Sequence, residues 1–476
     1  MSAHVGANPQ ILAGKSSGGL ANFRIIPRIE TYPRVLAFAQ TVAGKLTILA
    51  VFAFGLRLAI EEWLPVSVCL VVITFLPARR RLLVTASTII FTFVLPWSKY
   101  LHPLYTSALI VSVIAIGAIL FWLSVEWPQS VVGRHPVFIL VGGYSLLLIF
   151  AAYFPNTTRV YLTVWDFTAT FGVYLWFIAY SLADSRLPSR DNFVNQLGTY
   201  RPFWGLTVVP IPKGATYWRR IEARNAEQLA VAQLKGLKLL AWSLLISIFF
   251  KYFSAFVHGY LAIPAFSLAF ARSAQRLPYP WYLCWASLLA EFVEQILSVS
   301  VWGHRLIACC RMAGFNALRN TYRPLSSRTI AEFWNRYYFY FKELMVDLFF
   351  YPVFLNFFKK QKKLRMAAAT FAAAGFGNAL YHFFHDPKYV AQLGLWRALT
   401  SFRVYLFYCL ILATAITISQ LRRRPAAPTG FLRARVWPAF CVASFYCVLH
   451  VFDNTDRVYP LLEHFRFLGR LFNLNV

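Results

Sequence analysis

The sequence predicts an all-α, polytopic integral membrane protein, on the grounds of its composition and the spacing of its apolar runs. Of the 476 residues, 59% are hydrophobic and only 14% are charged, which is too apolar a balance for an ordinary soluble enzyme. Apolar runs of about 20 residues, the length that a helix needs to cross the hydrocarbon core of a bilayer, recur along the chain. We expect about ten or eleven transmembrane helices.

The expected elements follow one another with short polar connections. Residues 1–34 contain no apolar core that could act as a secretory signal, and we expect a flexible cytoplasmic arm there. Residues 35–476 should form a single polytopic domain. The longer apolar runs cover 35–60, 105–127, 136–154, 163–182, 237–261, 281–302, 367–384, 395–419 and 437–451, and two shorter runs cover 64–78 and 82–97.

The basic residues indicate membrane topology rather than nucleic-acid binding. The chain has 47 Lys and Arg against 18 Asp and Glu, a net charge of +29. The basic residues cluster at the ends of apolar runs, in 79–81, 359–365 and 421–424, as in the cytoplasmic loops of membrane proteins. With the N-terminus inside, alternation along the expected spans places the basic loop 184–235 in the cytoplasm.

The cysteine and histidine patterns do not indicate a metal centre. The seven cysteines show neither metal-binding spacing nor the framework of a disulfide-rich secreted protein. Among the nine histidines only His382 and His385 lie close together, which is too few for the histidine boxes of a di-iron enzyme. We therefore expect no bound cofactor and no metal.

Residues 311–385 carry the most informative pattern. "RMAGF" begins at Arg311, "NTYRPLSSRTIAEFWNR" covers 320–336, and an apolar helix ends in "ALYH" at His382. Between them, 337–358 is aromatic but is interrupted by charged residues such as Asp347, and a full crossing there would break the alternation of sides. We expect a re-entrant or interfacial segment, because irregular backbone and charged side chains at membrane depth need protein or a water-filled cavity around them.

In order and spacing, these pieces resemble the membrane-bound O-acyltransferase family, in particular the bacterial branch that acylates hydroxyls of the cell envelope and of exopolysaccharides. The resemblance covers 311–385 and continues more weakly from 281, so that an acyltransferase core would span about 281–419. It implies that His382 is the catalytic histidine. After "EFW" the bacterial members usually carry a second histidine, and this chain has Tyr338 at that position. This difference implies one of three things: another acceptor, a Tyr338 hydroxyl that makes the hydrogen bonds of the missing histidine, or a loss of activity.

The residues themselves agree with a catalytic His382. An imidazole at membrane depth is costly unless it faces a polar cavity, and a neutral histidine is suited to take a proton from a hydroxyl. Asn378, four residues earlier, lies on the same helix face and is placed to orient it. His385 shares that face nearer the membrane end. The structural alternative for His382 is a hydrogen bond between helices.

Two further residues are candidates for supporting or substrate-positioning roles. Asn335 belongs to the "EFWNR" stretch, whose alternative interpretation is an amphipathic helix at the interface. Asp347 stands in an otherwise apolar stretch, where we expect a cation such as Arg336 or Lys342 to hold it.

The expected function is transfer of an acyl group from a thioester, acyl-CoA or an acyl-carrier protein, to a hydroxyl of a glycan, a lipid or a small molecule. The expected partners are membrane lipids, the acyl donor and the hydroxyl acceptor. The donor could be an acidic carrier protein, and we expect no nucleic-acid partner. The expected location is the bacterial inner membrane. A non-catalytic transporter or flippase for a lipid or lipid-linked substrate is the alternative, and an internal repeat with broken helices would favour it, but none is visible.

Overall fold

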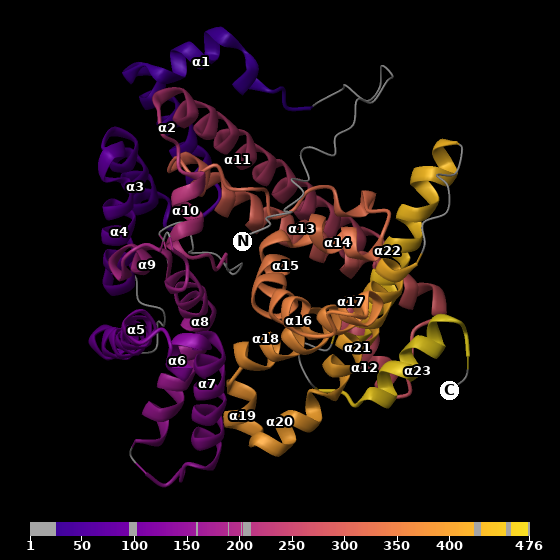
Figure 1. The fold of residues 1–476 in the computed structure, drawn as a ribbon. Coiled ribbons are helices and arrows are strands. Elements are labelled where there is room, and N and C mark those ends of the chain that lie inside the picture. Colours follow the sequence, from indigo (N-terminus) through magenta and orange to yellow (C-terminus); the bar gives the residue numbers. More distant parts are fainter. Residues whose placement is uncertain are drawn as a thin grey trace.

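The computed structural model describes residues 25–94, 102–158, 160–188, 190–200, 202, 211–422, 430–453 and 458–474. Most of the expected arm, 1–34, therefore lies outside the described residues. Within the described part every regular element is a helix, and the one β-type pairing is an isolated bridge between Glu222 and Phe315. The prediction of an all-α protein is confirmed, and Figure 1 shows how the helices are arranged.

Seven helices in the described part of the chain are long and apolar enough to cross a membrane. Two of these seven helices are continued by short turns of another helical type, which are π-helical in η5 and η9 and 3-10 in η10. The seven are α5 (Pro103–Glu126), α7 (Pro136–Tyr153), α8 (Tyr161–Ser185), α11 with η5 (Ala226–Ser254, Ala255–Tyr260), α13 (Trp281–Met312), α21 (Arg403–Leu421), and α22 with η9 and η10 (Trp437–Leu449, Leu432–Val436, His450–Phe452). The chain is thus an all-α polytopic membrane protein.

The remaining helices are shorter. Around the long helices lie η2 (Ile29–Thr31), η3 (Pro77–Arg79), α6 (Val131–Arg134), α9 (Phe193–Tyr200), α10 (Ala215–Ile221), α12 (Phe266–Ala274), α19 (Lys388–Leu393), α20 (Leu395–Ser401) and α23 (Leu461–Leu471). The segment 184–235, expected as a loop, therefore contains α9 and α10 and the start of α11.

The expected span 35–60 is bent rather than straight. It consists of α1 (Pro33–Gln40) and α2 (Val42–Arg57), which meet at 95°. Thr41 lies between them in an extended conformation, and its hydroxyl accepts a hydrogen bond of 3.0 Å from the backbone N–H of Gly44, which caps α2. A Cβ at Gly44 would lie 1.9 Å from the Phe38 carbonyl oxygen, so only glycine permits this close turn.

Among the residues that the structure describes, the number of long apolar helices is seven, or eight if the bent pair forms one span, against the ten or eleven expected. The two shorter apolar runs form α3 (Trp63–Phe75) and α4 (Arg80–Val94), with 13 and 15 residues. At 1.5 Å per residue, the 13 residues of α3 make a helix of about 20 Å, which does not reach across a hydrocarbon core of about 30 Å.

The motif region is built from short helical pieces. Residues after η6 (Pro324–Ser326) form α14 (Ile330–Tyr337), α15 (Phe339–Met345), η7 (Val346–Phe350) and α16 (Tyr351–Asn356). The chain is then helical from Lys362 to His385 through α17 (Lys362–Thr370), the π-helical η8 (Phe371–Gly377) and α18 (Asn378–His385). Figure 1 shows α14 to α18 in the centre of the view, to the right of α8.

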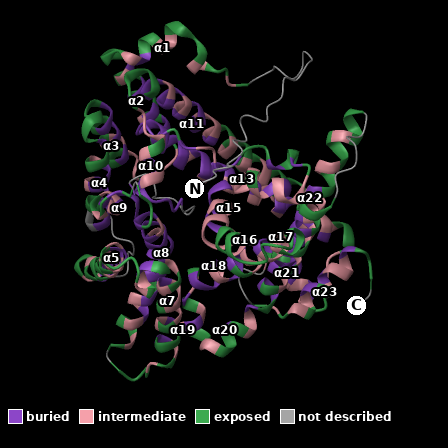
Figure 2. Ribbon diagram, in the orientation of Figure 1, coloured by how far each residue is buried: buried purple, intermediate pink, exposed green. Residues whose placement is uncertain are grey.

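Two apolar cores hold these helices together. One core joins α1 to α4 with α11 and the end of α13, and includes Phe52 and Leu240. The larger core joins α5, α7 and α8 with α13, the motif region, α21 and α22, and includes Tyr174 and Leu412. Figure 2 shows the buried residues gathered on the inward faces of the helices.

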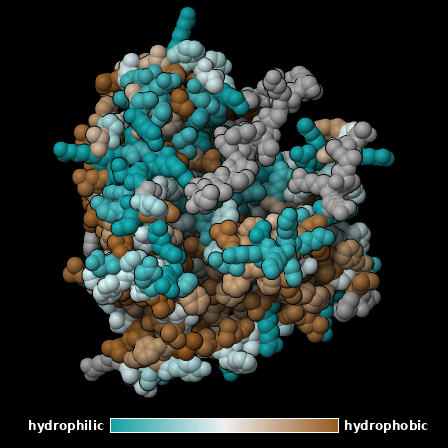
Figure 3. Space-filling model, in the orientation of Figure 1, coloured by the Kyte–Doolittle hydropathy of each residue, from teal (hydrophilic) through white to brown (hydrophobic). Residues whose placement is uncertain are grey.

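Large apolar side chains also cover much of the outside. They stand exposed on α5, α7, α11 and α22, for example Phe138 at 76% and Phe440 at 60%. Figure 3 shows hydrophobic residues spread over the lower part of one face and hydrophilic residues above them. Outward apolar surface of this extent suits contact with lipid.

Candidate functional site

His382 lies half-buried on α18 among aromatic rings. Its ring centroid is 4.7 Å from that of Tyr405, 5.2 Å from Tyr381 and 5.8 Å from Phe341. These neighbours come from α21, α18 and α15, so His382 stands where three segments meet.

The helix that carries His382 packs closely because small residues line it. The Ala-rich η8 packs against α21, and small side chains let two helix backbones approach. Gly377, at the end of η8, leaves room for η7, since a Cβ there would lie 2.6 Å from the Phe349 ring. The small residues before His382 thus place it beside α21 and the aromatic segment.

Asn378 is buried at 2% exposure, one helical turn before His382. Its side-chain oxygen accepts a hydrogen bond of 3.4 Å from the Tyr405 hydroxyl. The Tyr405 ring in turn packs on His382. Asn378 therefore acts on the His382 environment through Tyr405.

Tyr338 and His382 both contact Phe341, although they are far apart in the sequence. The Tyr338 ring centroid lies 5.5 Å from that of Phe341, and His382 lies on Phe341 at 5.8 Å. Tyr338 is the residue between α14 and α15, where the backbone leaves the helical conformation with φ −141° and ψ 75°. The prediction that these two residues lie near one another is confirmed.

The other two candidates from the motif lie farther out. His385 is exposed at the end of α18, with its ring 5.9 Å from that of Tyr381. Asn335 is exposed on α14 and belongs to the lining of the pocket described below.

Asp347 is held by a cation, but not by either cation expected. Its Oδ2 lies 2.6 Å from Lys213 Nζ and accepts a hydrogen bond of 2.8 Å from the Tyr180 hydroxyl. Arg336 pairs instead with Glu332 at 2.7 Å, and Lys342 pairs with its neighbour Glu343. The expectation of Arg336 or Lys342 was wrong because the partner comes from a segment remote in sequence, just before α10.

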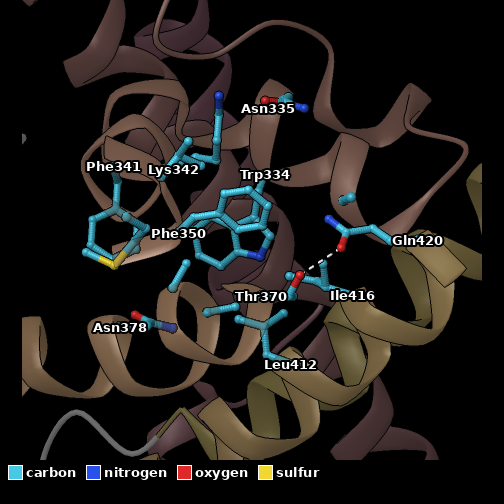
Figure 4. A pocket seen from close by; sticks show the side chains of 15 residues that line it. Trp334, Asn335, Phe341, Lys342, Phe350, Thr370, Asn378, Leu412, Ile416 and Gln420 are labelled. Atoms are coloured by element: carbon cyan, nitrogen blue, oxygen red, sulfur yellow. Dashed lines mark hydrogen bonds between the residues drawn. The ribbon is translucent and has the colours of Figure 1, made fainter. Parts of the chain in front are cut away.

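A pocket with a volume of about 260 Å³ opens beside this site. Figure 4 shows Trp334 among the lining residues and the 2.8 Å hydrogen bond that Thr370 donates to Gln420. The lining residues are Ala331, Trp334, Asn335, Phe341, Lys342, Met345, Val346, Phe350, Thr370, Ala373, Ala374, Asn378, Leu412, Ile416 and Gln420. The wall is mostly apolar with a few polar groups, as in pockets for amphiphilic ligands.

His382 and Tyr338 are not themselves part of that wall. The pocket reaches them through Phe341, which lines it and contacts both rings. Asn378 also lines the pocket, one turn from His382. The pocket and the imidazole are therefore neighbours separated by one layer of side chains.

A second ionisable pair near His382 was not recognised from the sequence. His450 Nδ1 lies 3.5 Å from Asp453 Oδ2 at the end of the α22 helix, and both side chains are largely buried, with 10% and 19% exposed. Burial by itself would raise the pKa of the Asp453 carboxyl, but hydrogen bonds with His450 and Gln295 and electrostatic interactions with His450 and His382 together hold that pKa below its usual value. Asp453 is thus a carboxylate at neutral pH.

The available signal for this pair was the H-x-x-D spacing at the end of the apolar run 437–451. Ionisable residues at membrane depth mark functional sites. Within the described residues, no three His, Cys, Asp or Glu side chains converge as ligands for a metal ion.

The fold and this site define the class: a polytopic helical membrane protein that encloses an imidazole, a carboxylate and several tyrosines beside an apolar pocket. No protein-family model and no curated protein matches the sequence.

Proposed function

We propose that this protein is a membrane O-acyltransferase that moves an acyl group from a thioester to a hydroxyl, with His382 as the general base. The observation that supports the proposal best is the meeting of Tyr338 and His382 on Phe341, which also lines the pocket. Two parts of one motif, distant in sequence, thus converge beside an apolar chamber.

The chemistry needs an imidazole that can take a proton from the acceptor. His382 removes the hydroxyl proton as the acceptor oxygen attacks the thioester carbonyl, and the resulting tetrahedral intermediate expels the thiolate, which recovers a proton. The Tyr338 hydroxyl would position or polarise a reacting oxygen. Asn378 keeps Tyr405 against the imidazole.

The pocket is suited to the acyl chain rather than to the whole donor. Its volume of about 260 Å³ falls just below the range of about 300–1,000 Å³ for drug-sized ligands. Apolar side chains such as Phe350, Leu412 and Ile416 line it. Excluding water from such a chamber would limit hydrolysis of the thioester.

Ion pairs between distant segments support a common side for the basic regions. Arg80 pairs with Glu222 at 3.2 Å, and Arg81 pairs with Asp191 at 3.4 Å, which joins 79–81 to the segment 184–235. Lys238 pairs with Glu30 at 3.3 Å, which adds the end of the N-terminal arm.

These contacts agree with an orientation in which the N-terminus and the basic segments face the cytoplasm of a bacterial inner membrane. The donor, acyl-CoA or an acidic acyl-carrier protein, would approach from that side as a co-substrate. No bound cofactor is required. The acceptor would be a glycan, a lipid or a small molecule that reaches His382 from the bilayer or from the opposite side.

The direct test compares the lipids and glycans of cells that express the wild-type protein with those of cells that express His382→Ala. We expect one class of molecule to lose a mass equal to an acyl group. An unchanged covalent profile together with an altered distribution of a lipid between the leaflets would contradict acyl transfer and favour the transporter.

A further inference from the structure

Asp453 lies where four helical segments approach one another. It directly follows η10, which packs against α13 and α21, and its carboxylate interacts with His450 of η10, with Gln295 of α13 and with His382 of α18. Phe452, the residue before Asp453, packs on Phe407 of α21 with ring centroids 5.0 Å apart. A carboxylate in this position faces the elements that build the candidate site.

The carboxylate is held in place. His450 Nδ1 lies 3.5 Å from Asp453 Oδ2, and the Gln295 amide donates a second hydrogen bond. The His450 ring packs against Phe266 with centroids 5.6 Å apart, which fixes it from the other side. A buried charge that is hydrogen-bonded and packed keeps a defined position.

The tyrosines of α21 connect this carboxylate to His382. Tyr405 stacks on Tyr408 with centroids 5.1 Å apart, and Tyr405 also lies 4.7 Å from the His382 ring. Tyr405 and Tyr408 are shielded from solvent at 7% and 8% exposure, and His382 is half-buried. In such surroundings a charge acts over a longer distance than in water.

We propose that Asp453, held by His450 and Gln295, is a positioning residue that stabilises His382 electrostatically in the charged form it takes up when it accepts a proton. This inference rests on the proposed acyl transfer. The base, His382 of α18, would thus be paired with a carboxylate that follows a different helical segment, η10. A base supported by a third group that orients it is a general arrangement in catalytic sites.

The proton passes from the acceptor to His382 and then to the leaving thiolate, and it is never transferred to Asp453. The acceptor O–H bond breaks, the proton moves to His382, and the acceptor oxygen forms its bond to the acyl carbon as the thiolate leaves. The imidazolium then returns the proton to the thiolate. Asp453 stays ionised and supplies only its charge.

Removing that charge should change the pH profile in a defined direction. Without the carboxylate the imidazolium is less stable, so the acidic limb of kcat/KM, which requires neutral His382, moves to lower pH while the maximum rate falls. The other titratable groups that interact with Asp453 are His450, Tyr337, Tyr405, Tyr408 and Cys409. His450 is the one imidazole among these groups, so it is varied separately.

The experiment measures pH profiles of acyl transfer for the full-length protein and for Asp453→Asn, Asp453→Glu and His450→Gln. We expect Asp453→Asn to lower kcat/KM by about tenfold or more and to displace the acidic limb to lower pH. A tenfold loss corresponds to a decrease of about one unit in the pKa of the His382 imidazolium. Asp453→Glu should recover part of both effects. His450→Gln keeps the carboxylate and should displace the limb less than Asp453→Asn does.

Asp386→Asn is the matched control. Asp386 follows α18 only four residues after His382, but its side chain is 41% exposed and lies 3.9 Å from Lys388. Its replacement should leave the pH profile unchanged. An unshifted limb in Asp453→Asn, or an equal shift in Asp386→Asn, would overturn the proposal.

A second measurement does not depend on catalysis. In protein labelled at histidine, the NMR titration of His382, assigned by comparison with His382→Ala, should move to lower pH in Asp453→Asn. If no donor supports acyl transfer, the proposed function fails, and this titration still decides whether Asp453 acts on His382. An unmoved titration in folded Asp453→Asn would reject the inference.

Discussion

Lys213 Nζ lies 2.6 Å from Asp347 Oδ2 and joins the segment before α10 to the π-helical turn η7 of the motif region. The ammonium group is buried at 5% exposure and also lies 3.6 Å from Glu343. It donates a hydrogen bond of 3.2 Å to the Tyr180 hydroxyl of α8. One lysine thus holds together three parts of the chain around the aromatic segment.

The first prediction is that Lys213→Met destabilises the protein. The change leaves Asp347 and Glu343 without their shared cation, and removing one partner of a buried charged pair costs more than the pair itself contributes. Because the Asp347 side chain keeps 32% exposure, we expect a loss on the order of 2 kcal/mol in the free energy of unfolding. Thermal unfolding in detergent measures it.

A double variant provides the control for this network. Lys213→Met combined with Asp347→Asn removes the stranded charge while it keeps an acceptor for Tyr180, so part of the lost stability should return. If Lys213→Met melts at the wild-type temperature, the ion pair does not hold the segment in place.

Elements defined by local composition could be predicted closely. The apolar runs 105–127 and 136–154 correspond to α5 (Pro103–Glu126) and α7 (Pro136–Tyr153), because a proline starts each helix and a single apolar run sets its length. Expected span 281–302 continues to Met312 in α13. There Arg305 bonds Ser243 and Ser247 of α11, so polar contacts extend the helix beyond its apolar part.

Features that depend on two distant segments could not be predicted in this way. The bend at Thr41 depends on a cap and on a close approach at Gly44, neither of which changes the average hydropathy of 35–60. Nothing local to Asp347 indicates Lys213. For the site, the order of motifs predicted that Tyr338 and His382 meet, whereas Asp453 belongs to no motif and was found from its contacts alone.

The second prediction concerns the size of the pocket. Ala374 lines it, and Ala374→Leu would fill part of its volume of about 260 Å³. If the pocket holds the acyl chain, transfer of long chains should fall by about tenfold or more while transfer of acetyl changes little, since a few buried methylenes contribute about 0.8 kcal/mol each. Transfer rates with thioesters of different chain length measure this.

Ala372→Leu is the matched control for that variant. Ala372 belongs to the same π-helical turn but does not line the pocket. It should keep the wild-type preference for chain length. Equal losses for all chain lengths in Ala374→Leu would indicate a general packing defect and would separate the pocket from the acyl group.

The third prediction is that Tyr338→Phe lowers acyl transfer by about tenfold or more without a loss of stability. The change removes one hydroxyl and keeps the ring on Phe341, and a hydrogen-bond donor to the reacting oxygen contributes this much or more to catalysis. Steady-state rates and thermal unfolding are measured together. Activity retained in full would leave Tyr338 with a packing role only.

The fourth prediction is topological. Arg224 is exposed between α10 and α11, and Asn156 is exposed between α7 and α8. In a variant without the seven native cysteines, Arg224→Cys should react only with a membrane-permeant reagent, and Asn156→Cys should also react with an impermeant one. Labelling of Arg224→Cys from outside intact cells would reverse the proposed orientation.

The fifth prediction is that His382→Ala abolishes most acyl transfer while the protein remains folded and inserted. A general base contributes about 10²- to 10⁴-fold to a rate, whereas an interhelical hydrogen bond in a bilayer contributes only about 0.6 kcal/mol on average. A catalytic His382 would therefore cost activity and little stability. A structural His382 would cost a modest amount of both. Acyl-transfer rates and melting temperature in detergent distinguish the two cases.

His385→Ala is the matched control, because His385 lies on the same helix one turn away and is exposed at its end. It removes an imidazole from outside the ring cluster of Tyr405 and Phe341, so it should keep substantial activity. An inactive His385→Ala beside an active His382→Ala would move the base to His385. Full activity of both variants, in an assay that detects wild-type transfer, would contradict the mechanism, because neither imidazole of α18 would then be needed by the reaction.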